Sequence, residues 1–207
     1  MKFLLATKQN MTQYFTENGE VFPATILSAG PAVVTQVKTK EKDGYESVQI
    51  GFGERPEKNI NKAQRGHMQK EGGKLFRYLR EFRLPESLDG SVYKIGDVLK
   101  VSLFEAGDAL CASGITKGKG FQGVVKRHGF HGGPRSHGQK HSEREPGSIG
   151  ATGPQRVFKG VRMAGRMGSN RVSVKGLHVL SVDEENNRLI VSGSLPGKRG
   201  TLIELRS

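Results

Sequence analysis

The chain has 207 residues, and its 33 lysine and arginine residues exceed its 20 acidic residues, giving a formal net charge of +13. The single cysteine, Cys111, excludes an intramolecular disulfide and any zinc site built on several thiolates. No apolar run approaches the roughly 20 residues of a membrane-spanning helix, and Phe3 to Ala6 is too short for a signal peptide, so we expect a cytoplasmic protein with no membrane partner.

Short apolar runs separated by turn residues predict β-strands along most of the chain. The turn residues Glu185, Asn186 and Asn187 predict a hairpin between the strands before and after them. We expect all the strands to share one sheet or barrel. The predicted strands are 2–9, 21–30, 32–39, 46–53, 97–104, 109–116, 171–183, 187–193 and 201–205.

Two stretches between these strands have a different pattern. Residues 56–73 are polar, with Pro56 as a candidate first helical residue and Gly72 and Gly73 as a stop, which predicts a short surface helix. Residues 74–85 place apolar side chains on one face of a strand, interrupted by Arg80, and a helix is the open alternative.

Most of the positive charge lies in one segment. Residues 126–171 contain ten lysines and arginines against only Glu143 and Glu145, together with ten glycines and nine apolar residues. A segment of this composition cannot bury enough apolar surface to fold alone. As a two-armed loop it would reach at most roughly 75 Å, at about 3.3 Å per extended residue, and could therefore penetrate a large partner.

The sequence GKGFQG at 118–123 matches the GxGxxG pattern of dinucleotide-binding loops. The glycines and the proline that follow within twenty residues argue against the long helix that such a loop must open. We therefore favour small residues that let the backbone approach phosphates closely, with Lys117 and Lys119 neutralising charge.

Four histidines at positions 128, 131, 137 and 141 raise the alternative of a zinc site. No thiolate lies nearby, and only Glu143 and Glu145 could orient the imidazoles, so stacking on bases or donation to phosphates is the favoured interpretation.

Ser136 and Ser148 lack a GxSxG elbow, and Glu184 and Glu185 lie in a predicted turn. The sequence therefore indicates no enzyme and no small-molecule substrate.

Basic residues recur every three to five positions from Arg156 to Lys175, with Phe158, Met163 and Met167 between them. A solvated charged surface is the simplest alternative, but acids that would balance the charge are nearly absent. Cations interleaved with glycine suit RNA, which proteins contact largely by shape and through phosphates and 2′-hydroxyls. Double-stranded DNA is the other candidate, although no helix-turn-helix, zinc-finger or zipper pattern is present.

Four motifs carry a family resemblance: TKGKGFQGVVKR at 116–127, RHGFHGG at 127–133, PGSIG at 146–150 and MAGRMG at 163–168. With them, essentially the whole chain closely resembles the bacterial large-subunit ribosomal proteins numbered three in the L series. The resemblance implies a mainly β fold: a translation-protein-type β-barrel with an α+β insertion and a long irregular basic extension. It places the barrel at 1–120 and 172–207, with the insertion at about 54–95, and an RNA-penetrating loop at 121–171.

The function that the resemblance implies is structural. Such a protein binds large-subunit ribosomal RNA, nucleates early subunit assembly and extends a basic finger toward the peptidyl transferase centre, with neighbouring ribosomal proteins as further partners. It needs no cofactor beyond Mg²⁺ held through the RNA. We expect residues 126–171 to order only when RNA screens their charge. A general architectural nucleic-acid-binding protein is the alternative.

The candidate RNA-binding residues are the cations, histidines and one aromatic residue of the basic segment and its approach. They are Lys117, Lys119, Lys126, Arg127, His128, Phe130, His131, Arg135, His137, Lys140, His141, Arg144, Arg156, Lys159, Arg162, Arg166 and Arg171.

Overall fold

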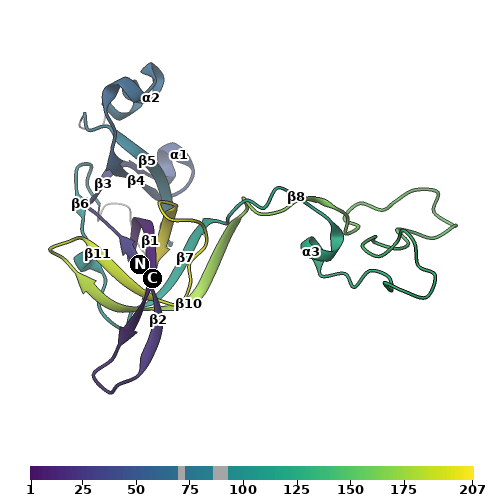
Figure 1. Cartoon of the computed structure of the whole chain (residues 1–207). Helices are drawn as coiled ribbons and strands as arrows, with labels where there is room; N and C mark the ends of the chain where they lie inside the picture. The colour runs from purple at the N-terminus through teal and green to yellow at the C-terminus, as the bar shows by residue number, and fades with distance from the viewer. Residues whose placement is uncertain (70–72, 86–92) are drawn as a thin grey trace. The chain divides into compact units, whose positions relative to one another are not determined.

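The computed structural model describes residues 1–69, 73–85 and 93–207 (Figure 1). The chain forms two compact units, one of Met1–Ile115 with Arg171–Ser207 and the other of Thr116–Asn170. We call them the barrel unit and the basic unit. Their limits lie a few residues from the expected boundaries after 120 and 171.

A closed barrel of six antiparallel strands forms the centre of the barrel unit. Strand β7 (Ala109–Ile115), which precedes the basic unit in the chain, pairs with β10 (Arg171–Asp183), which follows it. The prediction of a mainly β barrel that combines strands from both sides of the basic segment is therefore confirmed. The expectation that all the strands share one sheet or barrel is wrong, because those predicted at 32–39, 46–53 and 97–104 contribute to a separate sheet. Around the barrel the order is β1 (Phe3–Phe15), β12 (Leu202–Arg206), β7 (Ala109–Ile115), β10 (Arg171–Asp183), β11 (Arg188–Ser192) and β2 (Val21–Ser28).

A second sheet and two short helices complete the barrel unit. Residues 74–85, for which the sequence predicted a strand with a helix as the alternative, contain a strand. The helix predicted at 56–73 is a 3₁₀ turn followed by an α-helix. The Asn61 side chain caps the first turn of the α-helix by accepting a hydrogen bond from the Gln64 N–H at 2.7 Å. Residues 70–72 of the predicted helix lie outside the described residues. The elements are β5 (Phe76–Arg83), β4 (Ser47–Glu54), β3 (Ala32–Lys38) and β6 (Val98–Leu99) in sheet order, with α1 (Lys40–Asp43), η1 (Glu57–Asn59) and α2 (Lys62–Gln69).

The single strand predicted at 97–104 is wrong over its second half. The strand ends at Leu99, and a 3₁₀ turn, η3 (Val101–Leu103), follows. Both Val101 and Phe104 are buried, three residues apart. A spacing of three matches one turn of 3₁₀ helix, whereas a strand would turn these two side chains to opposite faces.

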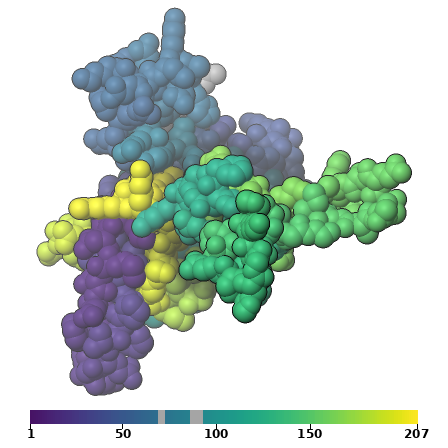
Figure 2. Space-filling view, turned by 45° about the vertical axis from the view of Figure 1, so that its right-hand side comes forward, coloured from purple at the N-terminus to yellow at the C-terminus, as the bar shows by residue number. Residues whose placement is uncertain are grey.

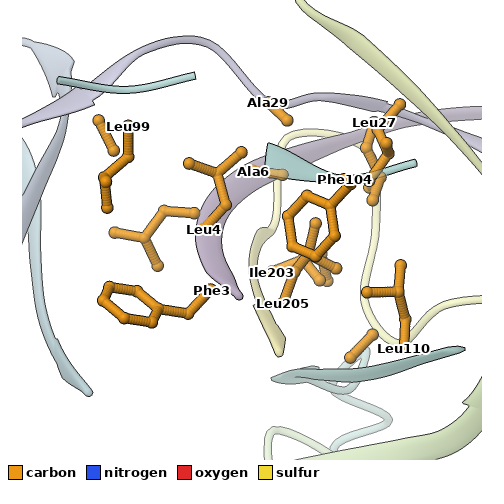
Figure 3. Close-up of a cluster of buried hydrophobic side chains, with 14 of the residues drawn as sticks. Phe3, Leu4, Ala6, Leu27, Ala29, Leu99, Phe104, Leu110, Ile203 and Leu205 are labelled. Atoms are coloured by element: carbon orange, nitrogen blue, oxygen red, sulfur yellow. The ribbon is translucent and has the colours of Figure 1, made fainter. Parts of the chain in front are cut away.

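The barrel and the second sheet share one hydrophobic core (Figure 3). The first four residues of β1 are all buried, because this strand has neighbours on both faces. The Phe3 ring stacks on the Phe82 ring of β5, with centroids 4.7 Å apart, while Leu4 points to the opposite side of the strand. Phe104, Leu110 and Ile203 lie together in the same close-up.

The predicted hairpin at 183–191 is confirmed by the pairing of β10 with β11. Asn187 adopts a left-handed φ of 51°, as expected of a turn asparagine. The Asp183 carboxylate accepts hydrogen bonds from the Asn186 backbone N–H, at 3.0 Å, and from its side chain, at 2.9 Å. These bonds favour the ionised carboxylate and lower the pKa of Asp183.

Regular structure in the basic unit is limited to three short elements. They are β8 (Phe121–Gln122), α3 (Val124–His128) and β9 (Gly165–Arg166). Among the described residues of the whole chain, no helix combines the length and apolar character needed to cross a membrane.

Candidate nucleic-acid interface

The two arms of the basic unit run antiparallel at their base. The Thr116 N–H donates to the Asn170 carbonyl at 3.0 Å, and the Ser169 N–H donates back to the Thr116 carbonyl at 3.2 Å. Further along, the Lys119 and Met167 N–H groups donate to the carbonyls of Met167 and Gly120, both at 2.9 Å. Pairing of β8 with β9 continues this ladder, which holds both arms at a fixed register.

Glycine allows the two arms to approach this closely. Gly168 has a left-handed φ of 77°, and a Cβ atom there would lie 2.1 Å from the Lys117 carbonyl oxygen. Such a distance is shorter than any real contact, so any other residue would force the arms apart. Small residues thus serve the packing of backbone against backbone at this position.

A second connection between the arms comes from α3. The helix begins after Gly123 and ends at His128, and the N–H of the next residue, Gly129, donates to the Val125 carbonyl. Its last turn carries Arg127 and His128, and both side chains reach the Met163 carbonyl of the other arm, at 2.5 Å and 3.0 Å. We call this pair of contacts the arm clamp.

The helix after GKGFQG is only five residues long. A dinucleotide-binding loop requires a helix whose N-terminus supports the pyrophosphate within a βαβ unit with parallel strands, but the only strands of the basic unit, all of which the structure describes, are the antiparallel β8 and β9. The geometry therefore does not match a dinucleotide-binding loop. Within the motif, Gly118 is the glycine that lies close to the other arm, where a Cβ atom would be 3.0 Å from the Ser169 hydroxyl.

The far loop of the basic unit is closed by a second set of contacts. The Gly133 N–H donates to the Glu143 carbonyl at 3.1 Å, and the Arg135 guanidinium pairs with the Glu143 carboxylate at 2.9 Å. Gly132 is left-handed, and a Cβ atom there would lie 2.0 Å from the same Glu143 carbonyl. Glu143 therefore closes a loop, and much of its charge is offset by Arg135.

A hollow of about 680 Å³ lies within the basic unit, between the helix end and the far loop. The His128 and Phe130 rings lie at one side with centroids 6.0 Å apart, and Arg162 and Glu145 supply charged groups. Glycine backbone lines much of the remainder. A planar group that stacks on a ring and offers both donors and acceptors matches these surroundings. The lining residues are His128, Gly129, Phe130, His131, Gly132, Gly133, Ser142, Glu145, Pro146, Gly147 and Arg162.

Most of the sequence-predicted site residues are solvent-exposed. Three are partly buried, namely Arg127 and His128 in the arm clamp and Phe130 beside the hollow. Arg171 belongs to the barrel unit, where its guanidinium pairs with the Glu204 carboxylate. The exposed members of the basic unit are Lys117, Lys119, Lys126, His131, Arg135, His137, Lys140, His141, Arg144, Arg156, Lys159, Arg162 and Arg166.

The basic unit has almost no core of its own. Val124 is the one buried residue between Thr116 and Asn170, a range that the structure describes completely. The same range holds eleven lysines and arginines and two acids. Its surface thus combines a high density of cations with a backbone that few side-chain contacts hold in place.

Exposed aromatic rings accompany these cations. Phe158 is 54% exposed, and the Arg156 guanidinium lies over its ring, 5.6 Å from the centroid. Phe121 is also exposed. Rings of this kind can stack on unpaired bases, and arginine adds charge to the stack.

Several residues that shape this unit were named in the sequence analysis but left out of the candidate RNA-binding set. The Met163 carbonyl accepts the arm clamp, Glu143 closes the far loop, and Phe158 presents an exposed ring. Only Phe158 had a usable signal, because it lies between Arg156 and Lys159 in the sequence. Among the residues that the structure describes, no three histidine, cysteine or acidic side chains are grouped so that they could hold a metal ion.

Comparison with known proteins identifies the family. A family model described as "Ribosomal protein L3" matches residues 68–189, which is more than half of the chain. The chain belongs to the ribosomal protein L3 family. Curated relatives match over almost their full length, and each carries the name "Large ribosomal subunit protein uL3".

Three of these relatives illustrate the degree of similarity. The protein of Heliobacterium modesticaldum is 52% identical over 98% of this chain and 95% of its own length. That of Carboxydothermus hydrogenoformans is 48% identical over 99% of this chain and 96% of its own. The protein of a Roseiflexus species is 52% identical over 98% of this chain and 95% of its own length.

Membership of the L3 family decides the general role. The chain is a structural protein of the large ribosomal subunit, a cytoplasmic assembly in bacteria, and it is not an enzyme. The resemblance carried by the four sequence motifs is confirmed.

Proposed function

We propose that the chain binds large-subunit ribosomal RNA through the basic unit, and that the exposed cations of this unit lie against phosphates. The observation that carries the proposal is the concentration of eleven lysines and arginines on a unit with one buried residue. Phosphates would screen this charge, and each contact would release condensed counterions. Neighbouring ribosomal proteins are expected as further partners, and any Mg²⁺ at the interface would be bound by the RNA.

The arm clamp and the hollow suggest how the unit meets RNA. The base ladder and the clamp fix the two arms up to Gly129 and Met163. Beyond them, the hollow offers the His128 and Phe130 rings to an unpaired base, with Arg162 beside it. RNA-binding proteins commonly read unstacked bases in this way.

RNA also supplies the contacts that the unit lacks. We expect residues 130–162 to adopt one conformation only on RNA, because the ladder and the arm clamp hold the base of the unit, whereas the contacts of Glu143 with Gly133 and Arg135 close the far loop without tying it to that base. This range is narrower than the 126–171 expected from composition, because α3, the arm clamp and the ladder order both ends.

Salt dependence tests the phosphate contacts. We expect the full chain carrying K140Q, K159Q and R162Q to bind large-subunit ribosomal RNA with a weaker salt dependence. The slope of log affinity against log salt concentration should be smaller in magnitude by about 2 to 3. The matched control changes three exposed lysines of the barrel unit, K42Q, K58Q and K62Q, and should alter the slope far less. Equal effects of the two triple variants would contradict the proposal, as would equal affinity for duplex DNA.

The path of the basic unit in the subunit is a further part of the proposal. We propose that its far loop extends toward the peptidyl transferase centre and that the chain joins the subunit early in assembly. A hydroxyl-radical source tethered at S136C, in a C111A background, should cleave RNA around that centre in purified subunits. Cleavage confined to distant RNA would contradict the path, and absence of the chain from the lightest assembly precursors would contradict the early role.

A further inference from the structure

Strands β1 and β2 continue beyond the closed barrel as a two-stranded ribbon (Figures 1 and 2). We call residues 9–24 the outer hairpin. Its turn is well defined: the Thr16 N–H donates to the Glu20 carbonyl at 2.9 Å, and the Glu20 N–H donates to the Thr16 hydroxyl at 3.1 Å. Two-stranded hairpins are marginally stable alone, so a partner would stabilise this one.

The outer hairpin exposes apolar side chains on both faces. Phe15 pairs with Val21 across the ribbon, and Met11 lies four pairs earlier, on the same face. These side chains are 65%, 49% and 49% exposed, respectively. Phe22, on the opposite face, is 39% exposed. Three of these large apolar groups therefore lie exposed on one face of a short ribbon, and the fourth is exposed on the other face, which is typical of a segment that binds another protein.

The charge of the outer hairpin is opposite to that of the chain. Residues 9–24 contain Glu17 and Glu20 and no lysine or arginine, in a chain of net charge +13. Both acids are exposed and lie in the turn, beside Phe15 and Val21. RNA would bring phosphates against these carboxylates with no cation between them, which is unfavourable.

We infer that the outer hairpin is a protein-docking surface, and that its partner presents aliphatic side chains bordered by lysine or arginine. The apolar faces would be buried in the contact, and the partner's cations would face Glu17 and Glu20. A second copy of this chain fits less well, because two acidic turns would repel each other. The inference rests on the proposed function in one respect: the partner is expected within the same ribosomal subunit.

Photo-crosslinking in purified large subunits tests the inference. The photoreactive residue p-benzoylphenylalanine replaces Phe15 in one full-length chain and Phe158 in another. The adduct at position 15 should survive ribonuclease, disappear with protease, and yield a partner peptide containing lysine or arginine beside aliphatic residues. Position 158 should link to RNA.

Each other outcome has a definite meaning. An adduct of position 15 with RNA or with a second copy of this chain would overturn the inference, as would no adduct there while position 158 reacts. Failure of position 158 to reach RNA would count against the proposed function, while the adduct at position 15 would still decide the docking surface.

Charge reversal gives a second readout. The variant E17K/E20K should lower the yield of the protein adduct at position 15 by about fivefold, since like charges would meet at the edge of the contact. The matched control E41K/E54K changes two exposed acids elsewhere in the barrel unit and should leave the yield unchanged. An unchanged yield in E17K/E20K would overturn the charge part of the inference.

Discussion

The Arg127 guanidinium donates to the Met163 carbonyl at 2.5 Å, across 36 positions of the sequence. A residue predicted to bind phosphate therefore joins the two arms of the basic unit. His128 donates to the same carbonyl, so the clamp has two members. Cations in an RNA-binding segment can thus build the scaffold that presents the others.

Removing the clamp should loosen the arms without unfolding the barrel. In R127A we expect faster amide exchange at residues 124–129 and 163–167 of the free chain, because one hydrogen bond of about 1 kcal/mol is lost. The neighbouring exposed residue gives the control K126A, which should leave exchange unchanged. Equal exchange in R127A and the parent chain would show that the clamp does not hold the arms.

Substitutions at Gly168 and Gly120 distinguish the cost of an unfavourable backbone φ from the cost of a steric clash. Both have positive φ, but a Cβ atom on Gly168 would meet the Lys117 carbonyl, whereas one on Gly120 would meet nothing within 4 Å. We expect G120A to cost about 1–2 kcal/mol of local stability, and G168A to break the ladder around Lys119 and Met167. Amide exchange of the Lys119 and Met167 N–H groups measures the difference. Similar protection in both variants would contradict the proposed close approach.

Arg166 and Arg171 lie five residues apart but should differ in role. R166Q removes an exposed cation of the basic unit. It should reduce the slope of log RNA affinity against log salt concentration by roughly 0.7 to 0.9. R171Q should leave that slope unchanged. It should lower the free energy of unfolding of the barrel unit by less than about 1 kcal/mol, because the Glu204 carboxylate, 13% exposed, still pairs with the Arg80 guanidinium at 3.1 Å. Salt titration and thermal unfolding give the two readouts. A reduced slope in R171Q would return Arg171 to the RNA-binding set.

The ion pair between Lys38 and Glu81 makes barrel stability depend on pH. Their side chains lie 2.6 Å apart, and the Ser47 hydroxyl also donates to Glu81. Burial opposes ionisation of Glu81, but the hydrogen bonds from Lys38 and Ser47 outweigh it and lower the pKa of the carboxyl below its usual 4.5. The bond to Glu81 in turn raises the pKa of Lys38 above its usual 10.5.

The stabilisation from this pair should be complete between about pH 4.5 and 10.5. It should fall in acid as the pH drops through the lowered pKa of Glu81, and in base as the pH rises through the raised pKa of Lys38. In E81Q the free energy of unfolding should vary less with pH and be lower at neutral pH by about 1 kcal/mol. Denaturant unfolding across this range checks the sign, with exposed E41Q as the control. A parent curve as flat as that of E81Q would contradict the account.

Alternation and turn residues made most of the strands predictable, and the family resemblance implied the barrel. Hairpin 183–191 follows from local turn residues, and the pairing of strands from both sides of the basic segment was expected because that segment is an insert within one domain. The error at 97–104 arose because Val101 and Phe104 are as apolar as strand residues, and only their burial on one side reveals the 3₁₀ turn. Composition alone cannot separate these two structures.

Contacts between distant residues were beyond sequence reasoning. Nothing near Arg127 in the sequence indicates that a carbonyl 36 residues away accepts its side chain, and Arg171 resembles the cations before it although it pairs with Glu204. Cations were found because charge is local in the sequence. Their separation into scaffold and exposed surface depends on tertiary geometry.

Hydrogen exchange of residues 130–162, compared between the free chain and the large subunit, tests the central claim most directly. The account predicts rapid exchange in the free chain, strong protection in the subunit, and slow exchange of β7 and β10 in both. Exchange of 130–162 in the free chain as slow as that of these strands would contradict it, because the segment would then owe its conformation to its own contacts and not to RNA.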